Sequence, residues 1–351
     1  MRQRAHRLRS SSEHPERVRN HRAMPCHSKC PYERKWPRDR SSSAQIHSRI
    51  ELACLSPRIG GRKMLTLSFE TELLDGHFNT AINYTPLAHL ALLSLDRLIG
   101  GIRPGQLLFL SGSPGASKTT LVNQIGDDLA AQGHPVLFFT FEVGASQLVA
   151  KSLARLSGDA FTLSDIPGLQ NNSERCGALL SALEKYREAI APNICFLTQF
   201  FNTTEIGAYV ATCESQTTQK PIVLLDYLQI IKAEEDASFL DERMAIKQAV
   251  LGLRRIANLH GVPIIAVSSV NRQNYDTGAT SLSALGGCSF IEYSADIVLN
   301  LSVAGRNKEE RATNLSLEKR PVTITALKNR FGQTGEISLV FDAPHARFEE
   351  E

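Results

Sequence analysis

Residues 107–120, LLFLSGSPGASKTT, carry the most specific pattern in this sequence. The apolar run Leu107–Leu110 predicts a buried strand, and the residues after Lys118 predict a helix. Between them, Gly112–Thr119 nearly matches the phosphate-binding pattern G-x-x-x-x-G-K-S/T. In such a loop, backbone N–H groups turn toward phosphate oxygens, the lysine reaches the β- and γ-phosphates, and the hydroxyl ligates Mg²⁺. The expected ATP-binding residues are Gly112, Ser113, Pro114, Gly115, Ala116, Ser117, Lys118, Thr119 and Thr120.

One position departs from this pattern, because Ser117 stands where the second glycine is expected. If the backbone there is left-handed, a serine costs about 1–2 kcal/mol relative to glycine. The competing interpretation is a chance loop of glycine and serine. The order of strand, loop, Lys-Thr and helix favours the phosphate-binding loop.

The bulk composition limits the class of protein. The 351 residues are enough for one large domain or two small ones, and 42% of them are hydrophobic, which is ample for a buried core. No apolar run approaches the roughly 20 residues that a membrane span requires, so we expect no membrane association. Seven cysteines, scattered and odd in number, do not indicate a disulfide framework, and we expect a reducing, cytoplasmic setting.

The net charge of +3 hides an asymmetry along the chain. Residues 1–63 hold 16 Lys and Arg against 5 Asp and Glu, whereas the remaining residues hold 23 against 31. The body of the protein is therefore not a broadly basic nucleic-acid binder, and any contact with DNA there must be local.

Residues 1–63 are rich in Arg, Ser, His and Pro and too poor in apolar residues to fold alone. They are a disordered basic arm that contacts nucleic acid, a transit peptide, or upstream sequence translated from a start assigned too early, with Met64 as the natural start. We favour the last interpretation. Residues 64–90 are expected to form a linker or docking segment, followed by an ATPase domain at 91–348.

Beyond the loop, apolar runs and helical patterns alternate along the chain. The alternation predicts an α/β fold in which helices cover both faces of a mostly parallel sheet. The last two expected strands flank a turn at 330–335 and predict an antiparallel hairpin. The expected strands span 107–110, 136–141, 194–197, 222–225, 263–267, 297–301, 323–327 and 337–341, and the expected helices span 121–131, 146–156, 176–190, 204–213 and 241–259.

Two acidic residues come at the ends of expected strands, where sheets of this kind bind their ligands: Glu142 and Asp226. Asp226 suits a residue that holds Mg²⁺ together with Thr119, and Glu142 suits a base that orients and deprotonates an attacking water. Alone, each would be interpreted as a cap or a solvated edge. Together with Lys118 they favour a catalytic triphosphate site.

Five segments resemble, in order, motifs of the DnaB-type replicative helicases, which are hexameric RecA-fold motors. The likenesses are to that family's glutamate motif, its aspartate motif, its third strand with sensor, the segment after its DNA-facing loop, and its hairpin that reaches the neighbouring subunit's nucleotide. The segments are FFTFE at 138–142, LLDYLQI at 224–230, PIIAVSSVNR at 263–272, FIEYSADI at 290–297 and KNRFGQTG at 328–335. The resemblance covers about residues 90–348.

The resemblance implies a RecA-like P-loop NTPase fold, hydrolysis of ATP with Mg²⁺, and movement on single-stranded DNA in replication. It implies a homo-oligomer, expected to be a hexameric ring. It also implies that Lys328 and Arg330 act in trans on the γ-phosphate bound by the next subunit, a contact worth about 10³–10⁵ in rate. The alternative for these two side chains is a solvated hairpin tip.

Two further departures bear on the resemblance. Ser269 stands where many members have a glutamine that senses the γ-phosphate, and it marks the expected sensor together with Asn271. Gly286 and Gly287 stand where many members have an arginine-bearing DNA loop, although their backbone N–H groups can still contact phosphates. Two alternatives stay open: a nucleotide-dependent switch or assembly ATPase of the RadA/KaiC type without unwinding activity, and a degenerate ATPase that binds nucleotide without turnover.

Overall fold

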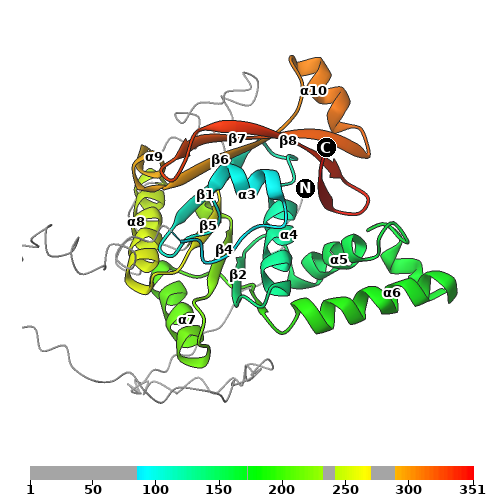
Figure 1. Ribbon diagram of the computed structural model, residues 1–351, viewed down its shortest axis with the longest axis horizontal. Coiled ribbons are helices and arrows are strands. Elements are labelled where there is room, and N and C mark those ends of the chain that lie inside the picture. The colour runs from blue at the N-terminus through cyan, green and yellow to red at the C-terminus, as the bar shows by residue number, and fades with distance from the viewer. Residues whose placement is uncertain (1–84, 172, 232–241, 270–288) are drawn as a thin grey trace, which may run out of the picture. The chain divides into compact units, whose positions relative to one another are not determined.

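The computed structural model describes residues 85–171, 173–231, 242–269 and 289–351, and these are called the described residues below. A nine-stranded sheet runs through them (Figure 1). Its strands are β1 (Leu107–Gly112), β2 (Val136–Thr140), β3 (Ile194–Leu197), β4 (Ile222–Asp226), β5 (Ile264–Val267), β6 (Ile297–Val303), β7 (Lys319–Asn329), β8 (Gly335–Asp342) and β9 (Arg347–Glu350).

The strands lie in the order β3-β2-β4-β5-β1-β6-β7-β8-β9. The first six are parallel, and β7, β8 and β9 continue the sheet antiparallel at one edge. The predicted α/β fold, with a mostly parallel sheet and a C-terminal antiparallel hairpin, is confirmed. The sequence patterns do not predict β9, because only one of its four residues is apolar.

Helices connect the strands. The α-helices are α3 (Leu93–Ile99), α4 (Lys118–Ala131), α5 (Ala145–Leu156), α6 (Ser173–Lys185), α7 (Thr203–Gln216), α8 (Glu242–His260), α9 (Ser289–Ser294) and α10 (Lys308–Leu315). Shorter helical turns are η1 (Ile166–Asn171), η2 (Tyr186–Ile190) and η3 (Leu228–Ile230). No described helix combines the length and apolar composition that crossing a membrane requires.

Alternate residues of each parallel strand face opposite helical layers. In β1, Leu108 and Leu110 pack into the core that includes α4 and α5, whereas Leu107 and Phe109 pack into the core that includes α7 and α8. Figure 1 shows these two layers on either side of the parallel strands. Because both faces are covered, the strands are continuous apolar runs, which is why the sequence locates them.

Some boundaries differ from the expected ones. Helix α4 begins at Lys118 rather than at 121, because the lysine of the loop is already the first helical residue. The expected helix at 176–190 is α6 followed by the π-helical turn η2. Helices α3 and α10 are missed because, at 7 and 8 residues, they are too short to display a helical period.

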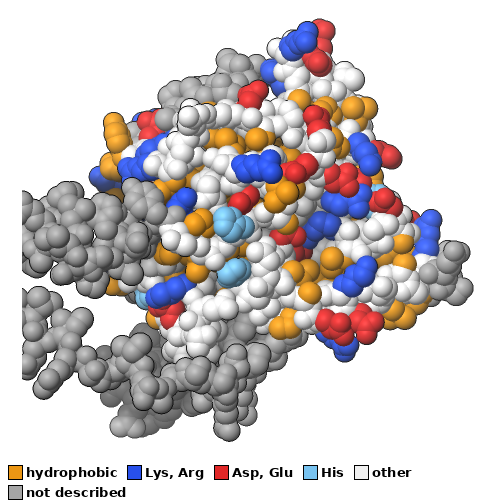
Figure 2. All heavy atoms as spheres, in the orientation of Figure 1, with side chains coloured by type: hydrophobic (Ala, Val, Ile, Leu, Met, Phe, Trp, Pro, Cys, Tyr) orange, Lys and Arg blue, Asp and Glu red, His pale blue; other side chains and the backbone are white. Residues whose placement is uncertain are grey.

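The predicted arm at 1–63 and most of the predicted linker at 64–90 lie outside the described residues, so the proposed domain boundaries stay a prediction. On the face in Figure 2, acidic and basic side chains are interspersed over the described part of the chain. This distribution agrees with the expectation that any DNA contact by the body is local.

Candidate functional site

The loop between β1 and α4 holds its lysine folded back over its own backbone. The Nζ of Lys118 donates hydrogen bonds to the carbonyl oxygens of Gly112, at 2.8 Å, and Ser113, at 3.0 Å. Burial lowers the pKa of Lys118, and the negative charges of Asp226 and Glu142 oppose that shift. The ammonium group is therefore placed between the loop and two carboxylates.

Two backbone positions give the loop its shape. Gly112 has φ +154°, and a Cβ atom there would lie 2.3 Å from the carbonyl oxygen of Leu301, so only glycine fits. Ser117 has φ 66° and ψ 30°, a left-handed conformation. The condition stated above for a strained serine is met, at a cost of about 1–2 kcal/mol.

The rest of the loop divides into an inner and an outer side. Ala116 and Thr120 are buried, with Ala116 donating its N–H to the Ser113 carbonyl at 3.2 Å. Pro114 and Gly115 are exposed, and nothing lies within 4 Å of the place where a Cβ of Gly115 would be. The outer side of the loop is thus free of packing.

Asp226, the last residue of β4, is 2% exposed and accepts a hydrogen bond from the Thr119 hydroxyl. Burial raises the pKa of Asp226, and the Glu142 charge adds to that rise, while the hydrogen bond and Lys118 oppose it. Its Oδ2 is buried without a hydrogen-bond partner. An unpaired carboxylate oxygen beside a hydroxyl is an all-oxygen donor set, which fits Mg²⁺.

Glu142 lies two residues past β2 and is exposed. The N–H of Phe141 donates to the carbonyl oxygen of Asp226 at 3.0 Å, which fixes the start of this turn beside the end of β4. The Thr140 hydroxyl donates to the Val143 carbonyl at 2.6 Å and closes the turn. A solvent-facing carboxylate is thereby held next to the loop and Asp226.

Lys328 and Arg330 do not join this cluster. Strand β6 pairs with β1 in parallel, with 297–301 opposite 108–112, and Asn329 of β7 pairs with the first residue of β6. The hairpin tip therefore lies where β1 begins, whereas the phosphate-binding loop lies where β1 ends. Along β1, residue 108 beside the hairpin and residue 112 at the loop are four residues apart, which is about 13 Å.

The family model described as the DnaB-like helicase C terminal domain matches residues 89–350. The chain belongs to this family. The resemblance drawn from the five sequence motifs is confirmed at the level of the family.

Known DnaB-like and RadA proteins are similar to most of this chain. The replicative DNA helicase DnaB of Mycoplasma genitalium is 28% identical over 265 residues, which are 73% of this chain and 54% of that protein. The DNA repair protein RadA of Halalkalibacterium halodurans is 24% identical over 268 residues, which are 76% of this chain and 45% of that protein. The chain spans about half the length of these curated relatives.

Two solved structures share the fold. One, described as an ATPase domain, superposes with a TM-score of 0.70 at 19% identity, covering 82% of this chain and 100% of that one. The other, a DnaB-like replicative helicase whose structure was described with its interactions with primase, superposes with a TM-score of 0.68 at 20% identity, covering 81% of this chain and 67% of that one. The DnaB-like fold predicted from the sequence is confirmed.

The structure of this DnaB-like chain adds a cation that the sequence analysis missed. Lys151 of α5 donates from Nζ to the Thr120 hydroxyl at 3.1 Å, beside the phosphate-binding loop. Burial lowers the pKa of Lys151, and the charge of Asp226 opposes the shift. The sequence pattern that could have indicated Lys151 is its position three residues after the buried Leu148, on the packed side of an amphipathic helix.

Gln229, which the sequence analysis did not single out, contacts the expected sensor residue Ser269. Ser269 donates its backbone N–H to Oε1 of Gln229 at 3.3 Å, and Gln229 Nε2 donates to the Ser268 hydroxyl at 3.0 Å. The Ser268 N–H in turn donates to the carbonyl of Leu110 at 2.9 Å. Gln229 therefore links the segment after Asp226 to the end of β5 and, through it, to β1. The predicted positions Asn271, Gly286 and Gly287 lie outside the described residues.

Proposed function

We propose that this chain is an ATP-hydrolysing motor of the DnaB type, which acts on single-stranded DNA as a ring of identical subunits, expected to be six. The observation that carries the proposal is the proximity of Lys118, Asp226 and Glu142, whose charges interact with one another beside the phosphate-binding loop. The chain spans about half of its curated relatives, so the activity of those whole proteins is a proposal for this chain.

The residues of this cluster have different proposed roles. Lys118 exchanges the carbonyl oxygens of its own loop for the β- and γ-phosphates, which are better partners for an ammonium group. Thr119 and Asp226 are the residues that would hold Mg²⁺. Bound there, Mg²⁺ would supply positive charge against the negative charge that develops on the transferred phosphoryl group. Lys151, next to Thr120, adds a second cation on the inner side of the loop.

Glu142 is the proposed general base. It orients a water molecule toward the γ-phosphate and accepts its proton, a contribution of about 10²–10⁴ in rate. Lys328 and Arg330 are proposed to complete the site of the adjoining subunit, because they lie at the far end of the sheet from their own loop. An isolated subunit should therefore hydrolyse ATP slowly.

Contact with DNA is proposed to be local. Ser269 and Asn271 are proposed to sense the γ-phosphate, and Gly286 and Gly287 to contact DNA phosphates through backbone N–H groups. The acidic balance of residues 64–351 favours such local contacts over a broad basic surface.

The first test measures ATP binding and hydrolysis, with and without single-stranded DNA. Lys118→Ala should weaken ATP binding by about tenfold or more, because a charge-assisted phosphate contact is lost. Glu142→Gln should leave ATP binding within about twofold and lower kcat by about 100-fold or more. Unchanged hydrolysis in either variant would contradict the proposal.

Matched controls separate these effects from loss of surface charge. Lys319→Ala removes a lysine whose side chain is 64% exposed, and Glu184→Gln removes a carboxylate whose side chain is 65% exposed. Neither residue is among the charges that act on Lys118 or Asp226, so both variants should keep the wild-type kcat.

The alternative is a nucleotide-dependent switch that binds DNA or a partner without unwinding. Similarity to RadA proteins and the acidic body favour it. A strand-displacement assay separates the two functions, because unwinding by the purified protein alone would exclude the switch.

A further inference from the structure

A buried carboxylate lies at the end of the sheet that carries the finger hairpin, defined here as residues 328–335. Asp296, directly before β6, is 6% exposed. Its Oδ1 accepts a hydrogen bond from Arg330 Nη1 at 3.1 Å, and its Oδ2 accepts one from Arg254 Nη2 at 2.8 Å. Oδ2 also accepts the backbone N–H of Leu107 at 2.9 Å. One carboxylate thus joins α8, β1 and the finger hairpin.

Arg254 fixes this carboxylate from the side of α8. Its side chain is only 20% exposed, and besides Asp296 it donates from Nε to the Ser294 carbonyl at 3.1 Å and from Nη1 to the Gly105 carbonyl at 3.2 Å. A guanidinium with three anchored nitrogens has little freedom to rotate. Asp296 is consequently held in one position with its Oδ1 directed at the finger hairpin.

Arg330 is anchored within its own subunit and is still half exposed. Its backbone N–H donates to the Asp296 carbonyl at 3.0 Å, and its Nη2 donates to the Tyr293 carbonyl at 3.0 Å. Its side chain is nevertheless 51% exposed. A guanidinium carries five N–H donors, and the contacts to Asp296 and Tyr293 take two of them. The remaining donors are available at the molecular surface.

We propose that Asp296 is a positioning residue that orients the Arg330 guanidinium toward the γ-phosphate bound by the adjoining subunit. This inference rests on the proposed function. An exposed arginine samples many rotamers, and ordering it only in the transition state would cost conformational entropy. Asp296 supplies that order in advance, so that the contact across subunits forms with a pre-oriented group.

An asparagine cannot replace this carboxylate. Three donors converge on Asp296, from Leu107, Arg254 and Arg330, and a carboxylate presents acceptors on both of its oxygens. Asparagine has a single acceptor oxygen, and its NH₂ group would meet another donor. Asp296→Asn should therefore release Arg330 or Arg254 while preserving the size of the side chain.

The test mixes two inactive full-length variants. Lys118→Ala has no working phosphate loop but an intact finger hairpin, and Arg330→Ala has the reverse. The mixture should hydrolyse ATP far faster than either variant alone, because the loop of one subunit meets the finger of the other. Asp296→Asn is then added to one variant at a time.

In the Lys118→Ala subunit, which donates the finger, Asp296→Asn should lower the rate of the mixture by about tenfold or more. In the Arg330→Ala subunit, whose own finger is already absent, it should lower the rate by less than about twofold. Asp296→Glu, which keeps a carboxylate, should recover part of the rate in the donor subunit. A role confined to folding would reduce the rate equally in both placements.

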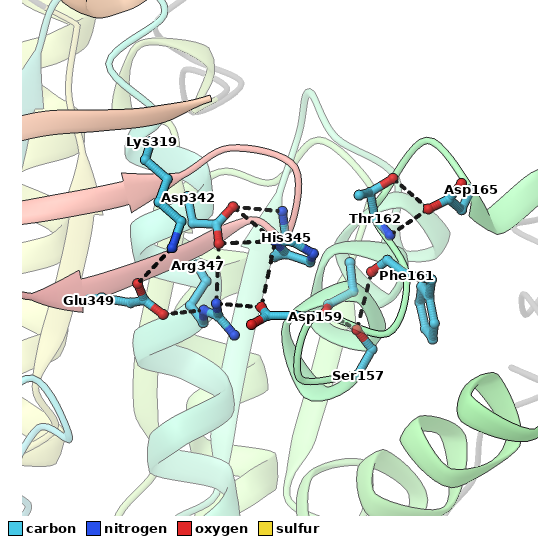
Figure 3. Close-up of polar contacts among 11 residues, drawn as sticks. Ser157, Asp159, Phe161, Thr162, Asp165, Lys319, Asp342, His345, Arg347 and Glu349 are labelled. Atoms are coloured by element: carbon cyan, nitrogen blue, oxygen red, sulfur yellow. Dashed lines mark hydrogen bonds and ion pairs between the residues drawn. The ribbon is translucent and has the colours of Figure 1, made fainter. Parts of the chain in front are cut away.

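A matched control comes from another buried aspartate. Asp342, at the end of β8, is 1% exposed and bonded to His345 and Arg347, and Arg347 also reaches Asp159, as Figure 3 shows. Among the described residues, Asp159, Asp342 and His345 form the one group whose spacing could hold a metal ion, and Arg347 already donates hydrogen bonds to both of its carboxylates. Asp342→Asn in the donor subunit should leave the rate of the mixture unchanged.

The outcomes distinguish the two proposals. If the parent mixture of Lys118→Ala and Arg330→Ala stays inactive, the proposed action of the finger in trans fails. If that mixture is active but Asp296→Asn acts equally in both placements, or raises the rate from the donor subunit, the role of Asp296 is overturned while the proposed function stands.

Discussion

At the scale of single residues, Ser117 shows that this loop keeps its left-handed turn without the glycine that normally provides it. The backbone at Ser117 has φ 66°, and the residue directly precedes α4. The strain of about 1–2 kcal/mol is offset by the rest of the loop, in which Lys118 is bonded to two loop carbonyls. The chain therefore holds the phosphate-binding shape at a measurable cost.

Ser117→Gly should raise the free energy of unfolding by about 0.5–1 kcal/mol. Glycine removes the left-handed strain but increases the entropy of the unfolded chain, so the gain is smaller than the strain itself. Equilibrium denaturation in urea, analysed at constant m-value, measures the change.

Ser113→Gly is the matched control, because Ser113 is not among the described residues with positive φ. That variant should lose about 0.4–1 kcal/mol, since only the unfolded-state entropy changes. A loss of the same size in Ser117→Gly would show that the serine is not strained. ATP affinity measured on the same proteins tests the degenerate-ATPase alternative, which requires tighter binding in Ser117→Gly.

The sequence predicts site residues well where chemistry and order along the chain coincide. Lys118, Glu142 and Asp226 were found because each follows a buried strand or closes one. Lys151 and Asp296 were not found as site residues, because their contacts depend on how α5, β1 and the hairpin pack together. A single sequence carries no record of such packing.

At the scale of elements, α4 and α5 are joined by buried charges. Arg155 of α5 forms an ion pair with Asp127 of α4, and both side chains are almost fully buried. Burial raises the pKa of Asp127 to about 6, with Arg155 opposing the rise. Burial also raises the pKa of Asp128 to about 6, and the charge of Asp127 adds to it. Two carboxyls thus share one guanidinium.

This arrangement predicts a stability that falls as pH rises. Because the folded pKa of Asp128 is raised from 3.8 to about 6, the unfolded chain releases its proton first, between about pH 4 and 6. The loss is about 3 kcal/mol at most for one carboxyl, at 1.36 kcal/mol per pKa unit. Asp128→Asn should therefore gain stability over wild type as pH increases from 4.5 to 7.

The difference in unfolding free energy between variant and wild type, measured at both pH values, reports the titration of Asp128 together with its coupling to Asp127. Glu188→Gln, at a side chain 67% exposed, is the control for the removal of a surface carboxylate. A constant difference for Asp128→Asn would mean that its carboxyl titrates normally in the folded protein.

The sequence predicted the strands that are buried on both faces of the sheet. The strands at the centre of the sheet are mostly apolar and were located within a residue or two at each end. Helices α3 and α10 and strand β9 were not predicted, because each is short, and β9 is also stabilised by contacts distant in sequence. For example, Phe348 of β9 pairs its backbone with the Gln124 side chain of α4.

At the scale of the whole molecule, the phosphate-binding loop and the finger hairpin lie at opposite ends of the parallel strands. If the proposed function holds, specific ATPase activity should rise with protein concentration and level off once subunits are assembled. Arg330→Ala should stay low at every concentration.

A dilution series of ATPase activity, paired with the mass of the assembly in ATP and in ADP, measures this dependence. A ring of six in ATP is the expected state. Constant specific activity from a stable monomer would instead favour the nucleotide-dependent switch.

Because the phosphate-binding loop and the finger hairpin lie at opposite ends of the sheet, the number of working sites depends on how the copies are arranged. If the proposed function holds, each molecule carries two unlike halves of a working site, one at each end, and neither half is used unless a copy docks in the same orientation. An open row of n copies then has n − 1 working sites, whereas joining its last member to its first gives n. Closure would add catalytic capacity without adding a subunit, a benefit that an assembly with like ends facing each other cannot obtain.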